Sequence, residues 1–201
     1  MKFVIGRTLT ILSWDNPVTA FFRKSRKLRH SLGRPSRSDF VHFEFAEVLF
    51  MKIEYRKADI TDAKLLIDIY NSAFYSDYIK YGECPAYGQT KEMMEKSIIN
   101  FPKFIILFNN KPVGCVSCKE VEVGVYEVGC LCVVPEFQGK GIGTQAIKFI
   151  TSHYENWDKF TLVTPIDKKE NVKFYTEKCG FDIVSMEMDG NVKVARFVLE
   201  K

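Results

Sequence analysis

A glycine-rich turn between an apolar strand and a helix constrains this chain more than any other feature. The apolar run ends at Pro135, which cannot donate to a β ladder, and Gly139, Gly141 and Gly143 follow at alternate positions where helical periodicity begins. Free N–H groups at the start of a helix attract anions, and glycines let the backbone approach a phosphate closely. The sequence therefore predicts a site for a phosphate-bearing ligand.

Two common nucleotide motifs do not fit this turn. A P-loop needs the spacing Gly-x-x-x-x-Gly-Lys-Ser/Thr, which is absent here. A dinucleotide fingerprint needs a third glycine where this chain has Thr144, and it opens a βαβ unit. The turn instead follows runs that favour antiparallel strands. Both nucleotide interpretations are therefore disfavoured.

The pattern around the turn predicts one mixed α/β domain over residues 51–201. Strands are expected at 53–57, 104–108, 113–121, 125–134, 160–164, 181–188 and 192–199. Helices are expected after a cap at Thr61 or Asp62, at 89–100, at 142–154 and at 171–179. Residues 75–89 are expected to form a turn-rich loop. Gly180 suits a left-handed helix cap, and Asp189-Gly190 suits a hairpin turn.

Residues 1–50 differ in composition from the rest of the 201-residue chain. They carry 9 Lys+Arg against 4 Asp+Glu, whereas residues 51–201 carry 20 against 21. Three interpretations compete for this basic N-terminal extension: a transit-like arm, a basic interaction tail that could tether the domain to RNA, or an upstream segment not native to the domain. The change from Arg to Lys usage at Met51 favours the third. The near-neutral core argues against a nucleic-acid partner.

All six cysteines follow residue 50, and no secretory signal precedes them. Cys115-x-x-Cys118 suggests a zinc knuckle, but the second pair, Cys130-x-Cys132, has the wrong spacing, and both pairs lie in strand-like runs. We therefore expect no metal site, reduced thiols and a cytoplasmic location. The apolar runs are too short to span a membrane.

Two motifs together resemble the GNAT superfamily of acetyl-CoA-dependent N-acetyltransferases. The first is the pyrophosphate loop Gln138-Gly139-Lys140-Gly141-Ile142-Gly143 with its Val-x-Pro lead-in. The second is Asn171-x-x-x-Tyr175-x-x-x-x-Gly180-Phe181. The resemblance spans residues 51–201. It implies a GNAT-like α/β fold, with a central, mostly antiparallel mixed sheet of six to seven strands and about four helices.

The resemblance also implies how acetyl-CoA would bind. The backbone of Leu131, Cys132 and Val133 would bond the pantetheine arm as an added strand. Asn171 would contact the cofactor from the other side, and Lys178 would meet a phosphate or remain a solvated lysine. The diphosphate would lie on backbone amides of the glycine-rich turn, namely those of Gln138, Gly139, Lys140, Gly141, Ile142, Gly143 and Thr144.

Acetylation of an amine needs a base to take a proton from the amine, a hydrogen-bond donor to the tetrahedral oxyanion and an acid to protonate the leaving thiolate. The resemblance assigns Tyr175 as proton donor to the departing CoA thiolate and suggests the Val133 N–H for the oxyanion. Glu127 is the candidate base, six residues before Val133 and expected on the same sheet face as Leu131 and Val133. Alternatively, Glu127 is a glutamate at the end of a strand that reaches solvent, and Tyr175 is an aromatic residue that fills the core.

We expect direct transfer to a small-molecule or peptide primary amine in a ternary complex, by a monomer or a homodimer. The alternative is a non-catalytic acyl-CoA-binding or regulatory module of the same fold. The expected loop at 75–89 would line the acceptor side. It carries acidic and aromatic side chains that suit a cationic amine: Asp77, Tyr78, Tyr81, Glu83 and Tyr87.

Overall fold

A computed structural model of the chain describes residues 52–201. The predictions for the basic N-terminal extension lie outside the described residues. None of the helices in the described part is long and apolar enough to cross a membrane.

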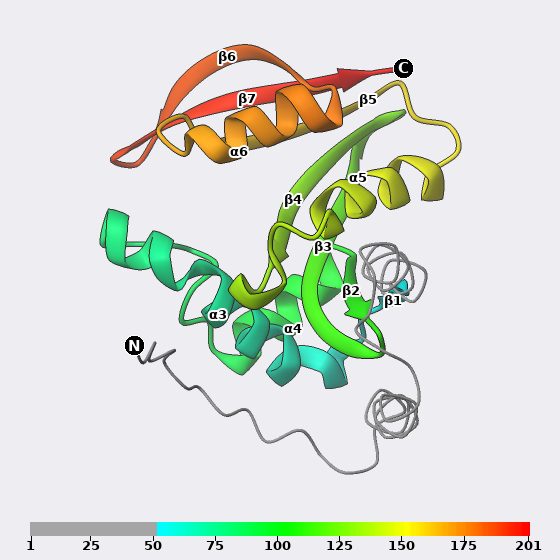
Figure 1. The fold of residues 1–201 in the computed structure, drawn as a ribbon, viewed down its shortest axis with the longest axis vertical. Coiled ribbons are helices and arrows are strands. Elements are labelled where there is room, and N and C mark those ends of the chain that lie inside the picture. The colour runs from blue at the N-terminus through cyan, green and yellow to red at the C-terminus, as the bar shows by residue number, and fades with distance from the viewer. Residues whose placement is uncertain (1–51) are drawn as a thin grey trace, which may run out of the picture. The chain divides into compact units, whose positions relative to one another are not determined.

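In residues 52–201, seven strands and four α-helices follow one another in the predicted order (Figure 1). The strands are β1 (Ile53–Lys57), β2 (Lys103–Phe108), β3 (Lys111–Glu122), β4 (Val125–Val133), β5 (Lys159–Pro165), β6 (Asp182–Asp189) and β7 (Val192–Glu200). The helices are α3 (Ala63–Tyr81), α4 (Lys91–Asn100), α5 (Ile142–His153) and α6 (Lys169–Lys173), which continues into a π-helical turn, η3 (Phe174–Lys178). Two short 3₁₀ turns are η1 (Ile60–Asp62) and η2 (Pro135–Phe137).

The strands that the structure describes form one sheet in the order β1-β2-β3-β4-β5-β7-β6. Every neighbouring pair is antiparallel except β4 and β5, which run parallel. This confirms the predicted mixed, mostly antiparallel sheet. The hairpin turn predicted at Asp189-Gly190 joins β6 to β7, with Gly190 at φ +56°.

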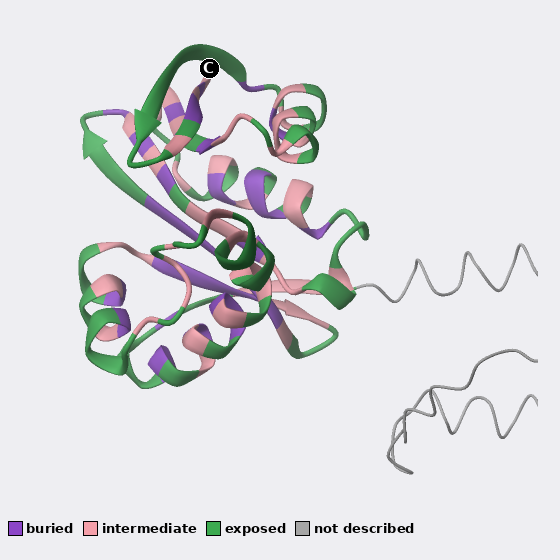
Figure 2. Ribbon diagram, turned by 90° about the vertical axis from the view of Figure 1, so that its left-hand side faces the viewer, coloured by how far each residue is buried: buried purple, intermediate pink, exposed green. Residues whose placement is uncertain are grey.

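Two hydrophobic layers cover the sheet, one on each face (Figure 2). One is built around Phe160, Phe181 and Phe197 and includes the apolar face of α5. The other is built around Leu66, Met94 and Ile105 and includes α3 and α4. Side chains of β4 therefore point alternately toward the α5 layer and the α3–α4 layer, which decides what each can reach.

Helix α3 is longer than the sequence predicts, because Tyr75–Tyr81 is helical rather than part of a loop. The breaker that ends it is Gly82, at φ +76°, whose N–H donates to the carbonyl of Tyr78. No glycine or proline precedes Gly82 in the helix, so nothing stops it earlier. Asp77, Tyr78 and Tyr81 thus lie on a helix and not on an acceptor loop.

The predicted cap of α3 is also different. The side chain of Asp59 accepts from the N–H of Thr61 and caps η1. Asp62 stands at the start of α3 without a side-chain cap bond, and its carboxylate instead receives two bonds from Arg56, at 2.8 and 2.7 Å. Arg56 accordingly lowers the pKa of Asp62.

Candidate functional site

The parallel strands β4 and β5 stay together for only three residues. Their ladder runs from Val125–Lys159 to Glu127–Thr161, and beyond it the strands diverge (Figure 1). The second half of β4 is consequently open although it lies in the middle of the sheet: Gly129 is exposed, and Cys130 and Leu131 are half-buried. An unpaired strand edge of this kind can accept an extended ligand as an added strand.

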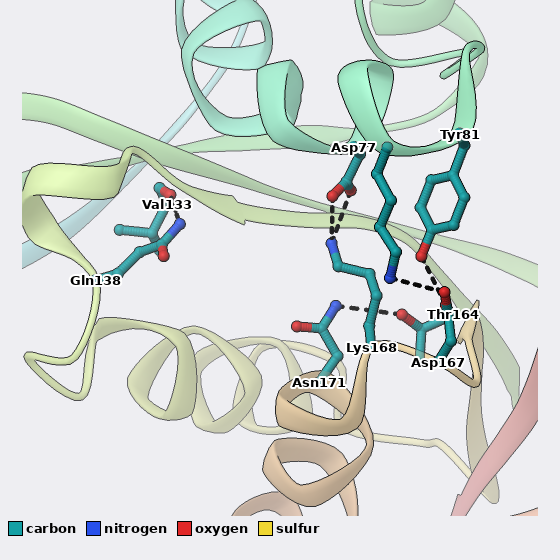
Figure 3. A network of polar contacts seen from close by, with 9 residues as sticks. Asp77, Tyr81, Val133, Gln138, Thr164, Asp167, Lys168 and Asn171 are labelled. Carbon is teal, nitrogen blue, oxygen red and sulfur yellow. Dashed lines mark hydrogen bonds and ion pairs between the residues drawn. The ribbon is translucent and has the colours of Figure 1, made fainter.

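We call the place where β4 and β5 separate, beyond the pair Glu127–Thr161, the split. The glycine-rich turn, which follows the end of β4, closes one end of it. Gly139 and Gly141 have φ of +74° and +76°, and a Cβ at either would meet no atom within 4 Å. Gly141 starts α5 without a side-chain cap, so the first N–H groups of the helix are free for an anion. Gln138 fixes the turn by donating from Nε2 to the carbonyl of Val133 at 2.8 Å (Figure 3).

The third glycine also has a packing role. Gly143 lies inside α5, and a Cβ there would come within 3.1 Å of Cζ of Phe174. The missing side chain lets α5 approach the π-helical turn that carries the next residue, Tyr175. Gly143 therefore positions two helices as well as lying near the free N–H groups.

Tyr175 is buried against three aromatic rings. Its ring centroid lies 4.9 Å from that of Phe174, 5.6 Å from Phe197 and 5.9 Å from Phe181. Burial raises the pKa of Tyr175, and the nearby thiols of Cys130, Cys179 and Cys132 raise it further. The phenol thus stays neutral and keeps a proton to donate, while its ring fills the core as the alternative interpretation expected.

Glu127 does not share a face with Leu131 and Val133, so this part of the prediction is wrong. The register pairs Ser117 with Cys130 but Cys118 with Val128, which leaves Gly129 as the extra residue of a β-bulge. The bulge reverses the alternation of side chains. Glu127 therefore lies on the face that carries Cys130 and Cys132, toward α3 and α4, while Val128, Leu131 and Val133 contact the α5 layer.

The bulge also brings Glu127 to a particular place. The pair Glu127–Thr161 is the last rung before β4 and β5 separate, so Glu127 stands at the point where the split begins. The side chain is half-buried. Tyr175 approaches from the α5 layer, so the two candidate catalytic groups come from opposite faces of the sheet.

Ion pairs join the end of α3 to the segment that follows β5 (Figure 3). Lys168 Nζ lies 2.7 Å from both carboxylate oxygens of Asp77. Asp167 accepts from the hydroxyl of Tyr81 and pairs with Lys80 Nζ, each at 2.7 Å. Sequence reasoning did not find these contacts, because their partners are far apart in the chain. Asp77 and Tyr81 are consequently engaged within the protein.

The remaining predicted cofactor residues differ in burial and in contacts. Asn171 is half-buried at the start of the Tyr175 segment, and its Nδ2 lies 3.3 Å from Thr164 Oγ1 on β5 (Figure 3). Lys140 and Lys178 are exposed. Among residues 52–201, no group of three or more His, Cys, Asp or Glu side chains is arranged to hold a metal ion.

The site therefore combines a free strand edge, a turn with uncapped N–H groups and a neutral phenol. These features fit an extended ligand that ends in phosphates. The strand edge can bond its chain, and the start of α5 can hold its negative charge.

Comparison with known families gives a match over residues 66–181, to the model described as the acetyltransferase (GNAT) family. Among curated proteins, the uncharacterized protein YrkN of Bacillus subtilis (strain 168) is 44% identical over 52 residues. That match spans 26% of this chain and 28% of the relative, so it concerns only a part of either protein.

Solved structures share the fold over most of their length. An acetyltransferase from Thermus thermophilus superposes with a TM-score of 0.64 at 18% identity, covering 76% of this chain and 99% of that one. The PaiA N-acetyltransferase of Thermoplasma acidophilum, solved with coenzyme A, gives 0.58 at 20% identity over 73% and 98%. The spermidine/spermine N-acetyltransferase SpeG of Vibrio cholerae gives 0.57 at 17% identity over 74% and 95%.

Proposed function

Because this chain belongs to the GNAT acetyltransferase family, we propose that it transfers the acetyl group of acetyl-CoA to a primary amine. The observation that carries the proposal is the split between β4 and β5, which begins at Glu127–Thr161 and ends at the glycine-rich turn. A binding site for a phosphate-bearing thioester needs both of these parts.

Acetyl-CoA fits the split in one direction. The open edge of β4 at Leu131–Val133 bonds the pantetheine arm, and the backbone amides from Gln138 to Thr144 receive the diphosphate. Asn171 borders the arm from the side of β5 and α6. The thioester then lies toward the bulge at Gly129, between Glu127 and Tyr175.

The two catalytic groups divide the proton transfers. A lysine-like amine with a pKa of about 10.4 is almost entirely protonated at neutral pH, so a base must assist its attack. Glu127, on the α3–α4 side, takes this proton directly or through water. Tyr175, on the α5 side, gives its proton to the departing thiolate. The oxyanion would be stabilised by a backbone N–H of β4 beside the bulge, because the Val133 N–H lies four residues further along the strand than Gly129.

The acceptor is a primary amine, small or peptide-borne. The engaged carboxylates of Asp77 and Asp167 argue against a site built around several free acidic groups. An aromatic surface remains near the end of α3, where the rings of Tyr78 and Tyr87 stack at 4.6 Å. Such rings suit the alkyl chain or the single cation of an amine.

Thermal unfolding of the full chain with acetyl-CoA, CoA and NADH tests the proposal. At one hundred times Kd a ligand stabilises by about 2.7 kcal/mol, or roughly 5–10 °C for a domain of this size. We expect a shift with both CoA species and none with NADH, followed by thiol release when primary amines are screened. A cooperative transition that no CoA species moves contradicts the proposal. A shift without thiol release from any amine supports the non-catalytic alternative.

A further inference from the structure

A row of polar side chains crosses three strands on the α3–α4 face of the sheet. Lys103 on β2 is the register partner of Ser117 on β3, and Ser117 is the partner of Cys130 on β4. Lys103 and Ser117 are buried, with 4% and 1% of their surface exposed. The row ends at Cys130, beside the bulge, where β4 is open. None of these three side chains has a part in the proposed transfer to an amine.

The ammonium group of Lys103 lacks an acidic partner in this part of the chain. Its Nζ lies 5.8 Å from the ring centroids of both Tyr70 and Phe101. None of the salt bridges or side-chain hydrogen bonds between described residues includes it. A buried lysine without an acidic partner is uncommon, so the polar groups nearest to it are the candidates for holding a counter-charge.

Three cysteines of the sheet and the phenol of Tyr70 belong to one hydrophobic cluster, on the face that carries Lys103. The Tyr70 hydroxyl lies 3.8 Å from Sγ of Cys115, and Cys132 is the register partner of Cys115. Burial raises the pKa of Cys115, and the neighbouring Cys130 together with burial raises that of Cys132. The pKa of Cys130 is lowered, chiefly by the neighbouring Cys132 and also by Tyr70 and the charge of Lys103, although burial opposes this.

Exposure also singles out Cys130. Cys115 is 0% exposed and Cys132 is 5% exposed, whereas Cys130 is half-buried at the open stretch of β4. It directly precedes the strand edge Leu131–Val133. The thiol that can carry charge is thus the one that a ligand in the split can reach.

We propose that Cys130 is a nucleophilic thiolate, paired with the Lys103 ammonium, and that it accepts the acetyl group of acetyl-CoA when no amine is bound. This inference rests on the proposed function, because it requires the thioester to lie in the split. The thiolate attacks the acetyl carbonyl, a bond forms between that carbon and Cys130 Sγ, and the bond to the CoA sulfur breaks. The CoA thiolate leaves with the electron pair and takes a proton from Tyr175, which regains one from water. The products are S-acetyl-Cys130 and CoA.

The thiolate is tested first without any CoA. The full chain is treated with iodoacetamide at pH 7, and the rate of alkylation is followed at each cysteine by peptide mass spectrometry. The reference is Cys179, also half-buried, whose pKa is raised by burial to about 11. We expect Cys130 to react at least about ten times faster, because the thiolate is the reactive form.

Matched variants test the role of the ammonium group. Lys103→Met keeps the length of the side chain and removes its charge, so it should slow alkylation of Cys130 about tenfold and leave Cys179 unchanged. Lys111→Met removes a lysine that also lies over an aromatic ring, 4.9 Å from Phe137, but is exposed, and it should have no effect. If Lys103→Met does not fold, Tyr70→Phe removes only a hydroxyl from the cluster and should slow Cys130 alone.

The acetyl transfer is then tested with acetyl-CoA in the absence of amines. After an acid quench, we expect the peptide that contains Cys130 to gain one acetyl group, released by neutral hydroxylamine and missing in Cys130→Ser. Alkylation of Cys130 no faster than that of Cys179 overturns the inference. So does an unmodified Cys130 in protein that acetyl-CoA demonstrably stabilises. Failure of the proposed function gives another result: acetyl-CoA then causes no shift of the melting temperature, while Cys130 is still alkylated faster than Cys179.

Discussion

The ring of Phe101 packs against one side of Gly129, and a Cβ at position 129 would lie 2.6 Å from Cζ of that ring. Phe101 directly follows α4, and Gly129 is the extra residue of the bulge in β4. The contact therefore ties the end of α4 to the strand that borders the split. A side chain at this position has no room unless the ring moves.

Gly129→Ala should destabilise the protein by about 1–3 kcal/mol, because overpacking forces a rigid ring and the backbone apart. It should also reduce acetyl transfer, since the bulge places both Glu127 and Cys130. Phe101→Leu in the same chain should recover part of the lost stability, and the double-mutant cycle measures the coupling. Additive effects of the two changes would show that the ring is not what excludes a side chain.

The bulge also explains why the face of Glu127 could not be predicted. Side chains alternate between the two faces of a sheet only while each residue pairs with a single residue of the neighbouring strand. Between Val133 and Glu127 this condition fails at the bulge residue Gly129. This change of face follows from the pairing of Ser117 with Cys130 and of Cys118 with Val128. The pairing is a property of β3 and β4 together and cannot be read from β4 alone. A glycine inside an apolar strand is a signal for a bulge, but it does not fix the register.

Local signals in the sequence predicted the elements well, and long-range contacts escaped it. Gly141, Gly180 and Gly190 have the positive φ that their turns require, and the strand and helix order follows from periodicity. The pair Asp77–Lys168 joins residues 91 positions apart, and nothing local in either segment indicates it. Such contacts are fixed by the way the sheet brings α3 and the end of β5 together.

Tyr175→Phe should lower turnover by about 10²–10⁴-fold with little change in the KM for acetyl-CoA, because it removes only the donated proton. The ring contacts remain, so the melting temperature should hold. The raised pKa also predicts that wild-type turnover shows no loss of this donor near pH 10, where an ordinary tyrosine ionises. Tyr126→Phe, in the same core, is the control and should retain turnover. Unchanged turnover in Tyr175→Phe would remove this residue from the mechanism.

Glu127→Gln should abolish the fall of the rate toward acidic pH that a protonated base causes. The amide is nearly the same size as the carboxylate, so packing at the start of the split is preserved. The check is kcat/KM as a function of pH for both proteins, with the most active amine from the screen. Glu136→Gln is the control, because Glu136 is exposed in η2. Identical pH profiles for wild type and Glu127→Gln would mean that another group accepts the proton.

Removing one partner of the Asp77–Lys168 pair should cost about 1–3 kcal/mol, because both side chains are largely buried and the remaining charge loses its counter-ion. Asp77→Asn combined with Lys168→Gln should cost less than the sum of the single changes. The surface pair Lys91–Glu95 is the control, and Lys91→Gln should change the free energy of unfolding by less than about 0.5 kcal/mol. Denaturant titration of all four variants measures these differences. Equal changes in the free energy of unfolding at the two sites would show that burial does not increase the contribution of the Asp77–Lys168 pair.

Tyr55→Phe should stabilise the protein by about 1 kcal/mol. The Tyr55 hydroxyl is enclosed and has no hydrogen-bond partner among the described residues, a cost that the phenylalanine avoids, while the stack on Phe149, with ring centroids 4.0 Å apart, is kept.

Burial raises the pKa of Tyr55 to about 12, so its contribution to stability is complete below the unfolded pKa of about 10 and is lost as the pH rises toward 12. The advantage of Tyr55→Phe should therefore grow above pH 10. Tyr154 is the matched control, because its pKa is also raised to about 12, but its hydroxyl donates to the carbonyl of Cys118 at 3.3 Å. Tyr154→Phe should destabilise, and a loss of stability in Tyr55→Phe as well would mean that the enclosed hydroxyl has a partner after all.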